Sequence, residues 1–64
     1  MYHVLDQIVV RLDHISAVGN LRDAKGRRLV SAFDIFMISG QVIAIHAESI
    51  ACAGAREALL EALG

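Results

Sequence analysis

The segment from Gln41 to Ala47 most constrains the fold of this chain, because it is apolar on both faces of an extended strand. Alternate positions divide its apolar side chains into two groups, with Val42 and Ala44 on one face and Ile43, Ile45 and Ala47 on the other. The first polar side chain after Gln41 is His46. A strand with this pattern is typical of a position that is covered on both sides. One helix of the same chain can cover only one of the two faces.

The chain is too short to supply both covering layers by itself. It has 64 residues, of which 56% are hydrophobic, and a net charge of −1, a balance that excludes a disordered chain. A domain of this size buries only about 60% of the surface of its unfolded form. Small domains therefore depend on disulfides, a structural metal or oligomerisation, and the single Cys52 excludes an internal disulfide. We expect one domain, residues 1–64, that forms a dimer or a higher homo-oligomer.

Three earlier segments predict antiparallel strands. They are Gln7–Asp13, in which Ile8, Val10 and Leu12 share one face, Ile15–Leu21, with a bulge or bend at Gly19-Asn20, and the Gly- and Pro-free run Arg27–Ser39. The third run spans some 40 Å if it is straight, at about 3.3 Å per residue. We expect it either to bend near Ser31-Ala32 or to extend beyond its own subunit.

Turn chemistry separates these strands. Asp23 and Gly26 occupy the first and fourth positions of a predicted type I turn, which forms a hairpin tip. Gly40 lies between two apolar runs and predicts a tight two-residue hairpin into the strand Gln41–Ala47.

A C-terminal helix is predicted from Ile50 to Leu63, with Ser49 as N-cap and Gly64 as terminator. It has two apolar faces: one contains Cys52, Leu59, Leu60 and Leu63, and the other is a stripe of Ala51, Ala55, Ala58 and Ala62. The alanines are either good helix formers at surface positions or a site where a second helix approaches closely. We favour an oligomer interface that contains this stripe together with Val42 and Ala44. The predicted fold is therefore α+β: a three- to four-stranded antiparallel β-meander over residues 4–47, followed by one helix over residues 50–63, in an oligomer.

Catalytic and metal-binding patterns are not indicated. His3, His14 and His46 lack the spacing of a metal pair, and the five glycines are too widely spaced for a phosphate loop. Cys52, near the start of the predicted helix, either pairs with His46 as a reactive thiolate or is a small buried hydrophobe, and we favour the second reading. We expect no metal, no cofactor and no enzymatic activity.

The region from Leu21 to Val30 is the most basic part of the chain. It contains the cations Arg22, Lys25, Arg27 and Arg28, which form a candidate site for nucleic acid or another anion if they repeat around an oligomer. The alternative is a solvated hairpin tip whose charges prevent edge aggregation. No aromatic residue is interleaved, so base recognition is not indicated.

The most economical functional hypothesis is a small non-enzymatic, homo-oligomeric regulatory module that acts through a larger protein partner. Nucleic-acid binding by the basic tips and binding of a small anionic ligand at a subunit interface remain alternatives. The longest charge-free run, between Asp34 and Glu48, has thirteen residues, whereas a bilayer span needs about 20, so no membrane association is expected. A single cysteine and no export signal suit the reducing cytoplasm.

Overall fold

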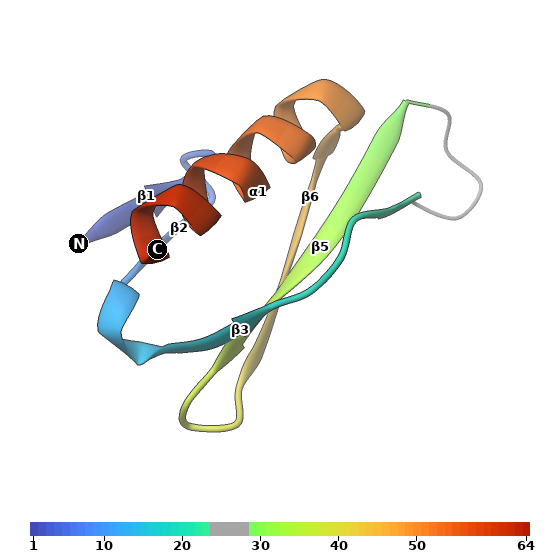
Figure 1. Cartoon of the computed structure of the whole chain (residues 1–64). Coiled ribbons are helices and arrows are strands. Elements are labelled where there is room, and N and C mark those ends of the chain that lie inside the picture. Colours follow the sequence, from blue (N-terminus) through green and yellow to red (C-terminus); the bar gives the residue numbers. More distant parts are fainter. Residues whose placement is uncertain (24–28) are drawn as a thin grey trace.

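The computed structural model describes residues 1–23 and 29–64, which form antiparallel sheets followed by a C-terminal helix (Figure 1). The elements are β1 (Tyr2–Val4), β2 (Ile8–Val10), the 3-10 turn η1 (Leu12–His14), β3 (Ile15–Val18), β4 (Arg22–Asp23), β5 (Val30–Met37), β6 (Val42–Glu48) and α1 (Ser49–Leu63). The predicted α+β class is confirmed.

Strand β5 is the centre of the four-stranded sheet. It pairs with β6 along one side over seven residue pairs, from Val30–Glu48 to Phe36–Val42. Along its other side it pairs first with β3 and then with β4, which follow one another on the same edge. The described strands thus form a meander of three rows. The second predicted strand, Ile15–Leu21, is confirmed only from Ile15 to Val18 and pairs within its own chain. Its bulge lies between Ile15 and Ala17 and not at Gly19-Asn20.

The prediction of a thirteen-residue strand from Arg27 to Ser39 is wrong in length. In the structure β5 has eight residues and begins at Val30. Leu29 has a φ of +62°, which interrupts extended backbone, and Arg27 and Arg28 lie outside the described residues. At Ser31 and Ala32, where a bend is expected from the sequence, the register with β6 is regular and contains no bulge.

The β5–β6 turn contains three residues, 38–40, and not the two predicted from the sequence. The amide of Gly40 donates to the carbonyl of Met37 at 2.9 Å, and the amide of Met37 donates to the carbonyl of Gln41 at 2.9 Å. Gly40 has a φ of +95°, the left-handed conformation that this class of loop requires at its last position.

An N-terminal hairpin of β1 and β2 was not predicted. Its turn places Leu5 and Asp6 at φ values of +50° and +57° and is closed by a 2.9 Å hydrogen bond from the amide of Gln7 to the carbonyl of Val4. The predicted strand Gln7–Asp13 is confirmed only from Ile8 to Val10, since the chain then enters the 3-10 turn η1.

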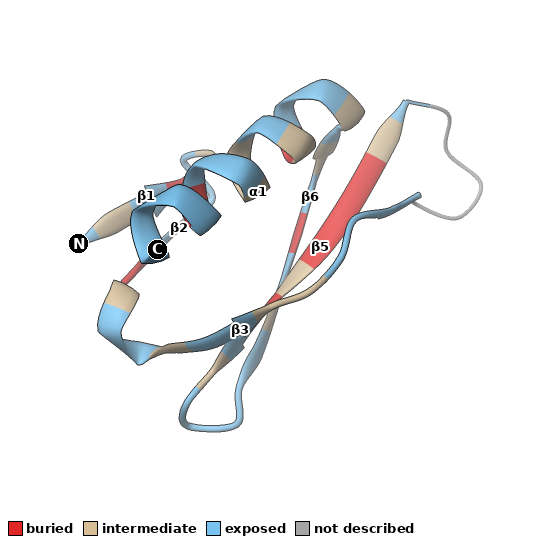
Figure 2. Cartoon of the chain, viewed as in Figure 1, coloured by how far each residue is buried: buried red, intermediate tan, exposed pale blue. Residues whose placement is uncertain are grey.

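The core lies between the sheet and one covering layer (Figure 2). Its buried members come from the hairpin, the sheet and the helix: Val4, Val10, Phe33, Ile35, Ile45, Cys52 and Leu59. Because the hairpin and α1 contribute to the same cluster as one face of β5 and β6, both pack on that face. We call it the inner face and the opposite side of the sheet the outer face.

Helix α1 begins at Ser49, directly after β6 and one residue before the predicted start. Ser49 does not cap the helix with its side chain; its Oγ lies 2.9 Å from Oγ of Ser31 instead. Cys52 and Leu59 are buried as predicted, whereas Leu60 and Leu63 are 40% and 38% exposed. The buried contact of the helix therefore extends from its first turn, at Cys52, to Leu59, and leaves the last turn exposed.

Candidate functional site

Apolar side chains on the outer face of the sheet form a row that crosses β3, β5 and β6. Antiparallel register aligns Ala17 of β3 with Phe36 of β5 and Phe36 with Val42 of β6. Phe36 is 38% exposed and Val42 is 52% exposed, and Ala17 is also exposed. Ala44, next along β6 on this face, extends the apolar surface. We call Ala17, Phe36, Val42 and Ala44 the apolar row.

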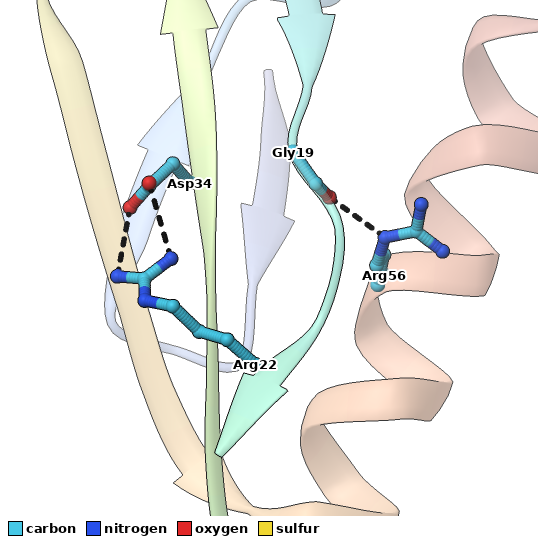
Figure 3. Close-up of polar contacts among 4 residues, drawn as sticks. All are labelled: Gly19, Arg22, Asp34 and Arg56. Atoms are coloured by element: carbon cyan, nitrogen blue, oxygen red, sulfur yellow. Dashed lines mark hydrogen bonds and ion pairs between the residues drawn. The ribbon is translucent and has the colours of Figure 1, made fainter. Parts of the chain in front are cut away.

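The other half of the outer face is polar. Nη1 of Arg22 lies 3.1 Å from Oδ2 of Asp34, and Nη2 lies 3.1 Å from Oδ1, so the two planar groups meet in a bidentate ion pair (Figure 3). His46, aligned with Ala32 on the same face, is exposed. The outer face thus joins an apolar end to an end with a balanced pair of charges.

The ion pair bears on the anion site that the sequence predicts, because it engages one of the four cations of that site. Arg22 is held by Asp34 and its charge is locally neutralised. Lys25, Arg27 and Arg28 lie outside the described residues. Of the four cations proposed for an anion site, the structure therefore places one, and that one belongs to the outer face.

Arg56 fixes the junction between β3 and β4 to the helix, a contact that sequence reasoning missed. Its Nε donates to the carbonyl of Gly19 at 2.8 Å, as Figure 3 shows, and its Nη2 lies 3.4 Å from Oδ1 of Asn20. The amide of Gly19 donates in turn to the carbonyl of Asp34 at 2.7 Å. A Cβ at Gly19 would lie 3.3 Å from that carbonyl oxygen and 3.4 Å from Cε2 of Phe36. The junction therefore sets the position of the apolar row.

The structure divides the predicted oligomer interface into two separate surfaces. Val42 and Ala44 are exposed on the outer face of the sheet. Ala51, Ala58 and Ala62 are exposed on the helix, which covers the inner face. Ala55, the fourth residue of the alanine stripe, is half-buried and packs against the core. No single contact surface of one protomer contains both groups.

Cys52 is fully buried on the inner side of the sheet. Burial raises the pKa of its thiol above the ordinary value of 9.0, although a backbone hydrogen bond from Ala47 and the charge of Arg22 act in the opposite direction. His46 lies on the outer face, so the sheet separates its imidazole from this thiol. The buried reading of Cys52 is confirmed.

Two shallow depressions mark the surface of the described residues. One, of about 670 Å³, is lined by Met1, Tyr2, Arg11, Leu12 and Asp13. The other, of about 430 Å³, is lined by Leu21, Arg22, Asp23, Ser31, Ser49 and Ala53. Neither set of lining residues places a nucleophile beside a histidine base. Residues 1–23 and 29–64 also contain no cluster of three metal-ligating side chains.

None of the described helices has the length and apolar character needed to cross a membrane. Comparisons with protein-family models, with curated proteins and with solved structures find no match to this chain. The surface chemistry of the protein is therefore the basis for a functional proposal.

Proposed function

We propose that this protein is a small, non-enzymatic binding module that assembles with copies of itself through the outer face of its sheet and regulates a larger protein partner. The observation that carries the proposal is the apolar row, which lies on the face opposite the hairpin and α1. Phe36 and Val42 are large apolar side chains left partly exposed on adjacent strands, at the last residue pair before the β5–β6 turn. Contiguous exposed apolar surface of this kind is typical of protein interaction sites.

The polar half of the outer face supports a specific orientation of the partner surface. The Arg22–Asp34 pair presents a positive and a negative group side by side at one end of the face. A second copy related by two-fold symmetry can place its own Asp34 near this Arg22 and the reverse, while the apolar rows meet. The face is thus self-complementary in both charge and polarity.

Light scattering after size-exclusion chromatography tests the proposal, with protein concentrations from about 1 to 500 µM. We expect a mass that is a multiple of 6.9 kDa at the upper end of this range. Phe36→Ser should shift the protein toward the monomer, because it replaces the central side chain of the apolar row. Leu60→Ser is the matched control, since Leu60 is exposed to a similar extent, 40%, but lies on the helix.

A monomer at all concentrations would refute self-assembly. A loss of assembly in Leu60→Ser but not in Phe36→Ser would move the interface to the helix and refute the role of the outer face. Circular dichroism on both variants verifies that the protomer remains folded. We place the module in the cytoplasm, because its only cysteine is a buried free thiol.

A further inference from the structure

The free margin of the four-stranded sheet is strand β6. In the part of the chain that the structure describes, β6 pairs with β5 and with no other strand, and Figure 3 shows it in pale yellow as the outermost strand on that side. The carbonyl of Gln41 accepts from the amide of Met37 on β5, so odd-numbered residues direct their main-chain groups toward β5. The amides and carbonyls of Val42 and Ala44 therefore point away from the sheet.

This margin lacks the features that usually prevent edge pairing. Monomeric proteins protect their edge strands with charged side chains, proline or bulges. The segment from Val42 to Ala47 contains no Lys, Arg, Asp, Glu or Pro, and its register with β5 is regular throughout. An edge strand of this kind is a template for another strand.

One side-chain contact of β6 limits where the second strand can lie. Nε2 of Gln7 donates to the carbonyl of His46 at 2.7 Å, so the turn of the N-terminal hairpin occupies one end of the margin. The outward main-chain groups of Val42 and Ala44 lie beyond this contact. A strand that leaves the Gln7 bond intact must pair with these two residues.

We propose that two copies of the chain join their β6 strands antiparallel, with the two-fold axis at Ile43, to form one continuous eight-stranded sheet. Val42 of each copy then exchanges two main-chain hydrogen bonds with Ala44 of the other, which gives four bonds in all. This inference rests on the proposed self-assembly and adds a second interface, at the edge instead of the face.

The side chains select the same register as the Gln7 contact. With the axis at Ile43, the two Ile43 residues form a non-hydrogen-bonded pair, in which Cα atoms approach to about 4.5 Å and side chains pack closely. Ile43 is half-buried on the inner face, so its partner completes the burial. On the outer face Val42 lies beside the partner's Ala44. A shift that moves the axis to Ala44 would place Val42 beside the partner's His46. The amide of Val42 would then compete with Gln7 for the carbonyl of His46.

Charge also favours a second copy in the antiparallel direction. Glu48 ends β6 at one end, and the turn at Gly40 ends it at the other. Antiparallel pairing places the two Glu48 carboxylates at opposite ends of the seam, so they do not repel one another. The apolar rows of the two outer faces then lie on the same side of one sheet, and stacking two such sheets gives a closed tetramer with D2 symmetry.

The direct test is nuclear magnetic resonance on an oligomer mixed from isotope-labelled and unlabelled chains. We expect an intermolecular contact between the Hα atoms of the two Ile43 residues, and exchange of the Val42 and Ala44 amides that slows by at least about tenfold as the oligomer forms. An oligomer in which these amides exchange as fast as in the monomer would overturn edge pairing while leaving assembly through the outer face intact. A contact between Ile43 and the partner's Ile45 would overturn the register.

A variant pair provides an independent measurement. Ala44→Pro removes the outward amide, which makes no bond to β5, and is expected to abolish the slow exchange at Val42. Ala44→Thr keeps that amide and should preserve it. If Ala44→Pro fails to fold, the labelled wild-type experiment decides the question by itself. A Phe36→Ser variant that remains a dimer with protected edge amides would support edge pairing and assign the outer face to the next step of assembly.

Discussion

Replacing Arg56 with methionine tests whether the junction between β3 and β4 depends on the helix. The substitution removes the 2.8 Å hydrogen bond from Nε of Arg56 to the carbonyl of Gly19 and the longer contact with Asn20. Methionine keeps an unbranched apolar stem of similar reach, so most of the packing is retained. The main consequence is a backbone carbonyl that loses its charged donor.

The expected loss follows from the burial of this contact. A hydrogen bond with a charged partner contributes about 1.5–3 kcal/mol, and the lower end applies because the side chain of Arg56 is only half-buried. A 64-residue domain has a free energy of unfolding of about 3–10 kcal/mol, so about 1.5 kcal/mol is a substantial fraction. It corresponds to a decrease in Tm of about 6–12 °C.

Urea unfolding at one fixed protein concentration measures this loss, with Arg11→Met as the matched control. Arg11 forms a 3.4 Å ion pair with Asp13, and the two side chains are 56% and 66% exposed. Such a pair contributes about 0–0.5 kcal/mol, and the control removes the same charge. Equal destabilisation by the two substitutions would show that net charge, and not the bond to Gly19, explains the effect.

Three further predictions concern the buried cysteine and two glycines. Burial raises the pKa of Cys52 above 9.0, so the unfolded chain loses this proton at a lower pH than the folded chain. The free energy of unfolding should therefore fall as pH rises above about 9. Urea titrations measure this fall, and Cys52→Ala should remove it. Gly54→Ala should raise the Tm, because a Cβ added at position 54 meets no atom within 4 Å. Alanine is favoured over glycine in a helix by about 0.5–1 kcal/mol. Gly19→Ala should lower the Tm, because its Cβ would crowd Asp34 and Phe36; the reverse order of the two glycine variants in a thermal melt would contradict this account of the junction.

The sheet around β6 was predictable because it depends on local patterns. Alternation assigned Val42 to one face and Ile45 to the other, and the observed burial follows that assignment. Gly40 marked the preceding turn correctly, although the loop has one residue more than expected. Periodicity of two residues and a left-handed glycine are features that a strand and its turn require in any context.

The N-terminal hairpin was not predictable from the same rules. Its strands have three residues each, and its turn uses Leu5 and Asp6 at positive φ without a glycine or an asparagine. A leucine in that conformation is uncommon and is maintained by tertiary packing, since Val4 and Val10 on either side of the turn enter the core. Local propensity carries no signal for a turn of this kind.

The candidate surface was predictable in part. Val42 and Ala44 were identified from the two-sided strand, but Phe36 was not, because its partners on the outer face are set by the register of β5 with β3 and β6. The alternation of side chains along β5 does indicate the position of Phe36, since it places Phe36 on the same face as Asp34 and on the opposite face from Phe33. The contact of Arg56 with Gly19 joins residues 37 positions apart, a separation at which no periodicity operates.

The position of α1 after the sheet determines the order in which the core closes during synthesis. Strands β3 and β4 both pair with β5, and β5 pairs with β6, so every strand pairing of the sheet is possible once residue 48 has left the ribosome. Its inner face, with Phe33, Ile35 and Ile45, then waits for Cys52 and Leu59 of the helix. At about 5–20 residues per second, the ribosome adds the fifteen residues of α1 within about 1–3 s. During that interval a nascent chain exposes its outer face and the part of its inner face that α1 covers, although the N-terminal hairpin is already made. Chaperones and neighbouring chains then have access to apolar surface that the folded protein buries.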